Sequence, residues 1–334
     1  MKTLITGASG FIGSFLVEES LRCGMDTWAG VRKSSSRIYL QDDRIRFAEL
    51  DLEHSERLEE QLRHHREEHG GWDCVIHCAG ATKCRRKEDF DRINFDSTRR
   101  FVDLLLKLDM QPHQFIYISS LSVYGPVHEQ NYIPIKETDI PSPDTAYGRS
   151  KLKSELYLQS LDDFPYVIFR PTGVYGPREK DYFMMAQSID RHIDVSVGYR
   201  RQDLTFIYVK DLVQAVFCAV EKGVIRRCYF VSDGCVYSSR AFSDYIKTAL
   251  GRRFVLHVTF PLVVLRLVSA IAETVAGWAG RSSTLNRDKY NIMKQRNWQC
   301  DITPLVKELG FKPEYDLERG VNECIAWYKK EKWL

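Results

Sequence analysis

The chain of 334 residues lacks a long uninterrupted apolar run, a Cys-x-x-Cys pair and a low-complexity tract. Its most apolar stretch, residues 258–280, is interrupted by Arg266 and Glu273, which argues against a membrane-spanning helix. The first residues show no basic region followed by the apolar core of a secretory signal, so we expect a cytoplasmic protein. The nine cysteines are odd in number and favour reduced thiols over a disulfide framework.

No metal site is predicted either. Residues 65–69 match a His-x-x-Glu-His zinc pattern, but they lie in a strongly charged helical segment that we interpret as a solvent-exposed face. The formal net charge of +3 falls short of the concentrated basic surface of a nucleic-acid binder, so we expect a small-molecule substrate and no nucleic-acid partner. With 44% hydrophobic and 28% charged residues, the composition is that of a globular protein.

The first half of the chain alternates short β-branched runs with helical patterns, as in a doubly wound parallel α/β sheet of the Rossmann type. The predicted helices span residues 11–24, 55–70, 88–109 and 144–161, and the predicted strands span residues 2–6, 26–31, 44–50, 73–78, 114–119 and 166–170. After Arg170 this alternation of strand and helix patterns ends, and loops rich in Pro and Gly follow. We therefore expect a dinucleotide-binding domain over residues 1–170. Residues 171–334 are expected to form mostly a smaller substrate-binding lobe, with some segments returning to the first domain.

A glycine-rich loop, TGASGFIG at residues 6–13, joins the first predicted strand to the first predicted helix. Gly7, Gly10 and Gly13 let the backbone turn tightly and approach a pyrophosphate, while Phe11 and Ile12 open a helix whose N-terminal N–H groups face the anion. The spacing is G-x-x-G-x-x-G, and its position predicts dinucleotide binding.

The end of the second strand indicates which dinucleotide is bound. An acid about 20 residues past the glycines would hold the ribose 2′-OH of NAD, but this segment reads Val31-Arg32-Lys33-Ser34 with no acid before Asp42. Arg32 and Lys33 suit a 2′-phosphate, which favours NADP(H) over the alternative NAD(H). An ordinary solvated basic loop is the other interpretation.

Tyr147 and Lys151 are four residues apart on a predicted helix, with Ser119 and Ser120 at the end of an upstream strand. An ammonium beside a phenol stabilises the phenolate, so we expect Lys151 to lower the pKa of Tyr147 and make it a general acid/base.

Taken together, these residues resemble the extended short-chain dehydrogenase/reductases, the NAD-dependent epimerase/dehydratase family. The resemblance covers nearly the whole chain, through TGASGFIG, Asp51-Leu52, Cys78-Ala79-Gly80-Ala81, INFDST (93–98), ISSLSVYG (118–125), YGRSK (147–151), RPTGVYGP (170–177), FIYVKDL (206–212) and LGFKP (309–313). It implies hydride transfer between a nicotinamide and a carbonyl or carbinol carbon.

The resemblance also assigns roles to residues. Tyr147 would move the proton, Lys151 would tune Tyr147 and hold the nicotinamide ribose, and Ser120, or otherwise Ser122, would hydrogen-bond the substrate oxygen. Asn94 would support the catalytic geometry. For the cofactor, the resemblance adds Asp51 and Leu52 beside the adenine, Ala79 and Gly80 along the dinucleotide, and Pro171, Gly173 and Val174 in a loop near the nicotinamide. It also implies a homodimer.

Two departures from the family's sequence pattern narrow the range of reactions that we expect. Leu121 and Ser122 stand where dehydratases of the family carry an Asp-Glu pair, and Leu204 stands where its sugar-nucleotide epimerases commonly carry a phosphate-binding Arg, although Arg200 and Arg201 lie close by. The apolar segment 258–280 is similar to the branch of 3β-hydroxysteroid dehydrogenases, dihydroflavonol reductases and keto-lipid reductases. We therefore expect a ketone–alcohol oxidoreductase for a bulky or apolar substrate. The alternatives are an NAD-dependent sugar-nucleotide epimerase and a non-catalytic dinucleotide-binding regulator.

Segment 258–280 itself leaves several interpretations open. Pro261 marks its expected helix start, and Arg266, Ser269, Glu273 and Gly277 form one narrow polar stripe that leaves a wide apolar face. That face would pack on the substrate lobe or a dimer partner, line an apolar substrate pocket, or contact a membrane surface.

Overall fold

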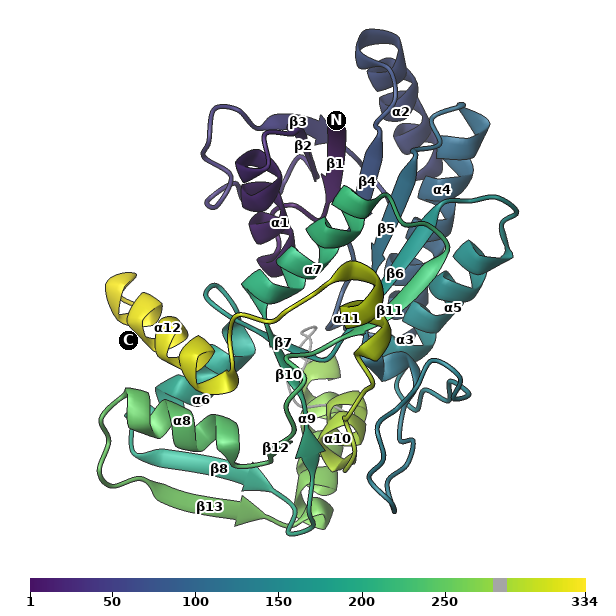
Figure 1. Ribbon diagram of the computed structural model, residues 1–334. Helices are drawn as coiled ribbons and strands as arrows, with labels where there is room; N and C mark the ends of the chain where they lie inside the picture. Colours follow the sequence, from purple (N-terminus) through teal and green to yellow (C-terminus); the bar gives the residue numbers. More distant parts are fainter. Residues whose placement is uncertain (279–286) are drawn as a thin grey trace. The chain divides into compact units, whose positions relative to one another are not determined.

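The computed structural model describes residues 1–278 and 287–334, and the chain divides into two compact units (Figure 1). The first unit comprises Met1–Ser120, Ala146–Arg170 and Val213–Tyr229. The second comprises Leu121–Thr145, Pro171–Leu212 and Phe230–Leu334. Each unit is thus assembled from three separate segments of the chain.

A seven-stranded sheet of order β11-β6-β5-β4-β1-β2-β3 forms the centre of the first unit. Its strands are β1 (Lys2–Thr6), β2 (Asp26–Val31), β3 (Arg46–Glu49), β4 (Cys74–His77), β5 (Gln114–Ile118), β6 (Tyr166–Pro171) and β11 (Arg227–Val231). The first six pair in parallel and confirm the predicted doubly wound fold. The strand order reverses between β1 and β4, and in such sheets ligands bind outside the carboxyl ends of the strands at that point.

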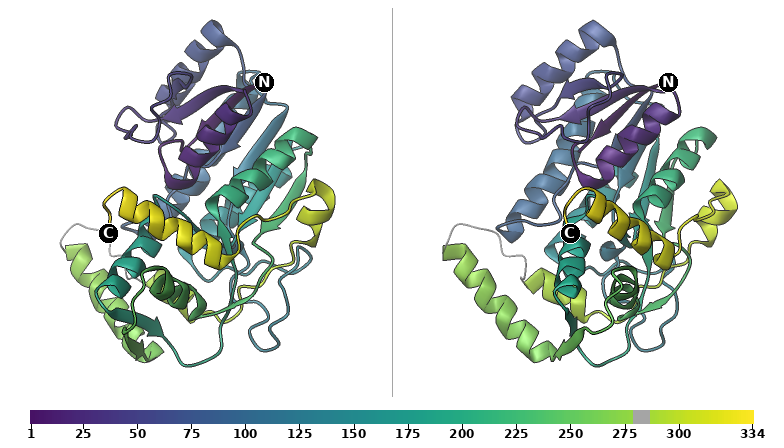
Figure 2. Two further views of the ribbon diagram at one scale, coloured as in Figure 1. Left: turned by 60° about the vertical axis from the view of Figure 1, so that its left-hand side comes forward. Right: turned by 90° about the vertical axis from the view of Figure 1, so that its left-hand side faces the viewer.

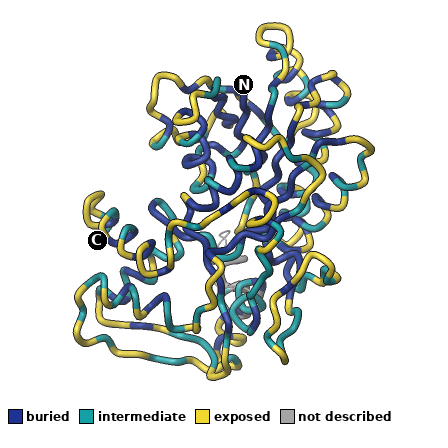
Figure 3. Tube along the Cα trace, in the orientation of Figure 1, coloured by how far each residue is buried: buried dark blue, intermediate teal, exposed yellow. Residues whose placement is uncertain are grey.

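Helices cover both faces of this sheet (Figures 1 and 2). One face carries α1 (Phe11–Arg22) and α7 (Val209–Lys222). The other packs against α2 (Ser55–His69), α4 (Ser97–Lys107) and α5 (Ala146–Ser160), whose Leu58, Phe101 and Leu158 are fully buried in one cluster with strand residues. Apolar burial of this kind, at roughly 25 cal/mol per Å², is the main favourable contribution to folding. In Figure 3 the central strands are accordingly the most buried part of the unit.

The helix predicted over residues 88–109 consists of three pieces. They are α3 (Lys87–Phe90), a π-helix η1 (Asp91–Asp96) and α4. The carbonyl oxygen of Asn94 accepts hydrogen bonds from the hydroxyls of Thr98, at 2.6 Å, and Ser154, at 3.1 Å. Side chains thus compete with the backbone at this turn, and such π-bulges occur frequently at functional sites.

The interpretation of residues 65–69 as a solvated face is wrong for His65. Its ring is buried, stacks on Trp72 with centroids 4.1 Å apart, and meets Trp28 edge-on. Burial lowers the pKa of His65 to about 4, so the imidazole is neutral at physiological pH. Within the described ranges no group of three or more His, Cys, Asp or Glu side chains is placed to hold a metal ion.

The second unit has its own core, in which Tyr175, Phe242 and Leu317 are buried. It contains three two-stranded sheets: β7 (Gly173–Tyr175) with β10 (Phe206–Tyr208), β9 (Asp203–Leu204) with β12 (Tyr237–Ser238), and β8 (Ile193–Val197) with β13 (Leu256–Phe260). Its helical elements are the 3-10 turn η2 (Leu121–Val123), α6 (Lys180–Asp190), α8 (Ala241–Ala249), α9 (Leu262–Trp278), α10 (Arg287–Lys294), α11 (Thr303–Leu309) and α12 (Leu317–Lys330).

Helix α9 begins directly after Pro261, as predicted. Of its expected polar stripe, Arg266 is exposed and Ser269 is buried, while the burial of Glu273 and Gly277 and the structure of residues 279–280 lie outside the described part. Among the residues that the structure describes, none of the helices is long and apolar enough to cross a bilayer.

Candidate active site

The glycine loop lies at the reversal point of the sheet, between the carboxyl ends of β1 and β4. Gly7 has a φ of +67°, and its carbonyl oxygen accepts a hydrogen bond of 2.9 Å from the N–H of Gly10. A Cβ at Gly7 would lie 2.8 Å from the nitrogen of Ala79, and a Cβ at Gly13 would overlap the carbonyl oxygen of Gly7. The close approach of three backbone segments therefore requires glycine here.

Residues after β4 line the same edge of the sheet. The N–H of Ala79 donates to Thr6 Oγ1 at 3.2 Å, and that hydroxyl lies 2.9 Å from His77 Nδ1. A Cβ on Gly80 would lie 3.0 Å from Asn94 Oδ1 and 3.5 Å from Lys151 Nζ. The backbone of Gly80 thus packs closely against these two polar side chains.

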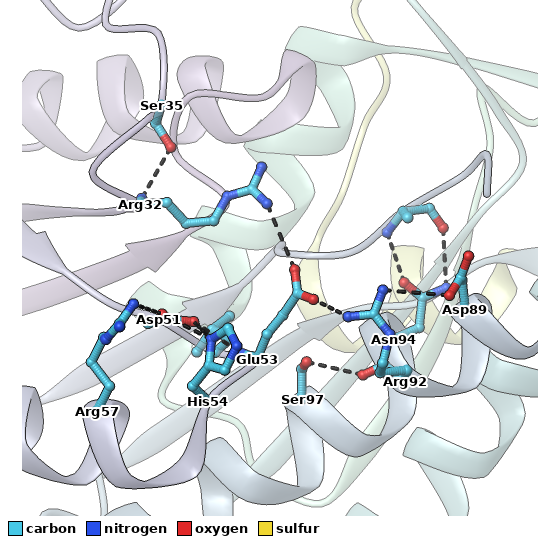
Figure 4. Close-up of polar contacts among 12 residues, drawn as sticks. Arg32, Ser35, Asp51, Glu53, His54, Arg57, Asp89, Arg92, Asn94 and Ser97 are labelled. Atoms are coloured by element: carbon cyan, nitrogen blue, oxygen red, sulfur yellow. Dashed lines mark hydrogen bonds and ion pairs between the residues drawn. The ribbon is translucent and has the colours of Figure 1, made fainter. Parts of the chain in front are cut away.

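Arg32 follows β2 and faces an acid that the sequence analysis missed (Figure 4). Its Nη1 lies 3.8 Å from Oε1 of Glu53, and the same carboxylate pairs with Arg92. The Arg32 side chain is 69% exposed, so the Glu53 contact holds it weakly and a phosphate has access to it. The N–H of Arg32 donates to Ser35 Oγ at 3.0 Å, and Lys33 is exposed.

Asp51 and Leu52 follow β3 at the same edge. The Asp51 carboxylate contacts His54 Nδ1 at 2.9 Å and Arg57 Nη1 at 2.9 Å, and these contacts outweigh burial and lower its pKa (Figure 4). The carbonyl oxygen of Leu52 accepts a hydrogen bond from Arg100 at 2.6 Å. The turn where an adenine is expected is therefore rigidly held.

Ser120 and Tyr147 belong to the same unit, with Ser120 just after the end of β5 and Tyr147 in the first turn of α5. Burial raises the pKa of Tyr147 to about 12, and the Ser120 hydroxyl offsets part of that rise. The expected lowering of the Tyr147 pKa is wrong for this structure, because burial raises that pKa and Lys151 Nζ donates its hydrogen bond to the Ile118 carbonyl. The phenol is therefore protonated at neutral pH and has a proton to donate.

Lys151 is buried and donates from Nζ to the carbonyl oxygen of Ile118 at 2.8 Å. The ammonium lies 4.6 Å from the centre of the Tyr117 ring, a favourable cation–π arrangement. Burial lowers the pKa of Lys151 to about 8, although Cys78 and Glu155 act to raise it. A buried lysine with so large a shift at a sheet edge is a feature typical of functional sites.

The sequence analysis did not predict a buried ion pair close to Lys151. Glu155, one helical turn after Lys151, pairs with Arg170 of β6 at 2.7 Å, and their side chains are 1% and 6% exposed. The same carboxylate accepts a hydrogen bond from Ser119. This network ties α5, which carries Tyr147 and Lys151, to the end of β5, which leads to Ser120. No local pattern in the sequence signals this pair, because Arg170 lies on another element, fifteen residues after Glu155.

Asn94 connects the loop after β4 to α5. Its Oδ1 accepts from the N–H of Ala81 at 2.7 Å, and its Nδ2 donates to the Ala81 carbonyl at 3.1 Å and to Ser150 Oγ at 3.0 Å. All of its amide hydrogen-bonding groups therefore serve positioning, and Asn94 holds the helix of Tyr147 against the loop of Gly80.

The remaining candidates belong to the second unit. Ser122 is buried in η2, and Pro171 ends β6. Gly173 and Val174 lie in β7, where a Cβ on Gly173 would lie 2.7 Å from the Tyr182 hydroxyl. The roles of these residues toward a cofactor or substrate stay predictions.

Comparison with known proteins gives one family match. The model described as "NAD dependent epimerase/dehydratase family" matches residues 3–231, more than half of the chain.

Individual relatives are distant but match over nearly their full lengths. The chain is 23% identical to the decarboxylating sterol-4-alpha-carboxylate 3-dehydrogenase of Saccharomyces cerevisiae, over 97% of each chain. It is 25% identical to the UDP-glucose 4-epimerase of Vibrio cholerae, over 96% of this chain and 93% of the relative. Among solved structures, the UDP-glucose 4-epimerase of Thermus thermophilus in complex with NAD matches with a TM-score of 0.77 at 19% identity, over 98% and 99% of the two chains. That structural likeness supports the fold.

Proposed function

Because the chain belongs to the NAD-dependent epimerase/dehydratase family, we propose that it is an NADP(H)-dependent oxidoreductase that interconverts a ketone and a secondary alcohol on a bulky or apolar substrate. One observation carries the proposal. Ser120, Tyr147 and the buried Lys151 lie in the same unit as the glycine loop, at the edge of the sheet where ligands bind.

The residues present fit a dinucleotide. Gly7, Gly10 and Gly13 leave the backbone bare where a pyrophosphate approaches, and α1 directs its N-terminal N–H groups to that point. The exposed guanidinium of Arg32 suits a 2′-phosphate, with Lys33 beside it. Lys151 and Asn94, whose polar atoms lie close to the Gly80 backbone, would hold the nicotinamide ribose.

In ketone reduction, the dinucleotide when bound supplies a hydride to the carbonyl carbon. Tyr147 donates its phenolic proton to the substrate oxygen, which its high pKa permits because the phenol stays protonated. Ser120 hydrogen-bonds the same oxygen. Lys151, while charged, stabilises the phenolate that remains, and oxidation of an alcohol runs these steps in reverse.

The catalytic part is tested with Tyr147→Phe. We expect turnover of a confirmed substrate to fall by roughly 10²–10⁴-fold, the usual contribution of a positioned acid, with dinucleotide binding retained. Leu156→Ser, an exposed change on the same helix, is the matched control. Full turnover by Tyr147→Phe would refute the assignment.

The cofactor is tested by denaturing freshly purified protein and identifying the released dinucleotide by mass spectrometry. Little bound cofactor, together with tighter binding of NADPH than of NADH, supports the proposal. Arg32→Gln should then weaken NADPH binding by about tenfold, the effect of one charge-assisted hydrogen bond, and leave NADH unchanged. Arg44→Gln, on the same loop but paired with Asp42, should alter neither.

An NAD-dependent sugar-nucleotide epimerase is the second candidate. Glu53 beside Arg32 favours it, because a carboxylate at this edge suits the free ribose hydroxyls of NAD, and so does the likeness to a UDP-glucose 4-epimerase. Against it, Arg201 is engaged by Asp203 at 2.6 Å. Near-stoichiometric release of NAD from the purified protein, with no effect of Arg32→Gln, would establish this candidate instead.

A further inference from the structure

Two short segments of the second unit expose an unusual density of large apolar side chains. We define the apolar face by Ile193 and Val195 of β8, Leu256 and Phe260 of β13, and Val263 and Leu267 of α9. All six are exposed, from 41% for Phe260 to 70% for Val263. Contiguous apolar surface of this kind on a folded protein usually marks an interaction site.

In the β8–β13 pair the apolar side chains lie on the exposed side of the sheet, which is the reverse of the usual arrangement. Ile193 pairs with Leu256, and Val195 pairs with Val258, so these side chains share one side of the two-stranded sheet. On the other side, Asp194 is buried and lies 2.8 Å from His257 Nδ1. A surface sheet ordinarily turns its apolar side to the core, so the exposed apolar side of this pair requires a partner.

Helix α9 continues the apolar face. Strand β13 leads into it through Pro261, and the side chain of Leu262 packs against Gly198, just past β8. Val263 and Leu267 are four residues apart and lie on one side of the helix. Figures 1 and 2 show α9 starting at the end of β13, and Figure 3 shows β8 and β13 among the exposed parts of the chain.

The same segments carry positive charge. Arg200, Arg253 and Arg266 are exposed and form no ion pair with any residue in the described ranges. The only acid in residues 191–201 and 251–268 is Asp194, which is buried. Cations therefore border the apolar face, and no side chain that the structure describes forms an ion pair with them; the next acid along α9 is Glu273.

This combination selects the partner. A symmetric dimer through the apolar face would add a second set of these three arginines around the same interface, which is electrostatically unfavourable. A bilayer that contains anionic lipids offers both an apolar interior for the side chains and negative headgroups for the arginines. We propose that this face docks on the surface of an anionic membrane, with residues Leu262–Val268 of α9 lying in the interface. The proposal goes beyond the proposed oxidoreductase activity and does not depend on it.

The test is co-sedimentation of the full-length protein, without cofactor or substrate, with phosphatidylcholine vesicles that contain or lack 30% phosphatidylglycerol. We expect binding to the anionic vesicles that weakens with salt. Arg253→Gln/Arg266→Gln should weaken it by roughly 5-fold per charge. Val263→Ser/Leu267→Ser should weaken it further, because the apolar contact is lost.

Ile140→Ser/Ile225→Ser, which removes exposed apolar side chains elsewhere, is the matched control and should bind like the wild type. Circular dichroism and the unfolding midpoint establish that each variant is folded. Failure of the wild type to sediment with anionic vesicles at low salt overturns the proposal. So does a wild-type dimer in solution that Val263→Ser/Leu267→Ser converts to monomer, because a second copy would then cover the face. Vesicle binding is measured independently of any enzymatic activity.

Discussion

Removing the charge of Lys151 should stabilise the fold while abolishing its chemistry. The pKa of Lys151 is lowered from 10.5 to about 8, mainly by burial. A shift of one unit corresponds to 1.36 kcal/mol, so the buried ammonium opposes folding by about 3 kcal/mol at neutral pH. Lys151→Met keeps most of the side-chain volume and loses the hydrogen bond to the Ile118 carbonyl, worth about 1 kcal/mol. We expect a net stabilisation of about 2 kcal/mol at pH 7.

The pH dependence gives the sign of this effect. The folded chain binds the Lys151 proton more weakly than the unfolded chain does, so the opposition to folding is complete below about pH 8 and disappears as the pH rises toward 10.5. Burial raises the pKa of the Cys78 and Cys300 thiols, which ionise in this range only when the chain unfolds, so the wild type alone is not informative. The difference between Lys151→Met and the wild type isolates the lysine, and should fall by about 2 kcal/mol between pH 7 and pH 9.5.

The assay is urea unfolding of the cofactor-free protein, in reductant, at both pH values. Lys153→Met is the matched control, since Lys153 is half-exposed and pairs with Asp91. Its effect should stay within about 0.5 kcal/mol and be independent of pH. If Lys151→Met destabilises the protein at pH 7, or if its effect is the same at both pH values, the assignment of a strained buried ammonium is refuted.

Three further predictions concern the same unit. Glu155→Gln should lower the free energy of unfolding by about 3–5 kcal/mol, because it leaves the Arg170 charge buried without a partner. The double variant Glu155→Gln/Arg170→Met should recover much of this loss in urea unfolding. Additive effects of the two changes would contradict a coupled pair. The rate of ketone reduction by the wild type should decline above about pH 8 as Lys151 loses its charge. Glu155→Gln should move this decline to lower pH, since Glu155 raises the lysine pKa. If the pH–rate profile does not move, the electrostatic effect of Glu155 on Lys151 is excluded. Gly13→Ala should cost about 1–3 kcal/mol through forced backbone shifts and impair dinucleotide binding, whereas Gly71→Ala, which has space for a Cβ, should be tolerated; equal effects in both assays would argue against the close packing of the loop.

Most of the first unit could be predicted from the sequence because its strands are short β-branched runs between helical patterns. Strand β11 was not predicted, because its residues, RCYFV, lie beyond Arg170, where the alternation of strand and helix patterns ends. The π-helix at Asn94 was also missed, since it depends on hydroxyls of Thr98 and Ser154 reaching one carbonyl oxygen. His65 had a signal that went unused: it lies seven residues after Leu58 and three after Leu62, on the buried side of α2.

The candidate site could be predicted in its residues but less well in its electrostatics. The glycine loop and the Tyr147–Lys151 spacing are local patterns, and both occur where the sequence analysis placed them. The rise in the pKa of Tyr147 comes from burial by surrounding elements, which spacing along one helix does not reveal. Likewise Glu53 meets Arg32 only because β2 and β3 are neighbours in the sheet.

The return of Val213–Tyr229 to the first unit governs how the protein can be made. Until residue 229 has left the ribosome, the sheet lacks its β11 edge and the covering of α7, and Gln114 lacks its acceptors at Ala219 and Val224. By then the whole intervening stretch Pro171–Leu212 has already emerged. The nascent chain cannot complete one unit and then begin the other, so a fragment ending at Arg170 is a poor candidate for expression by itself.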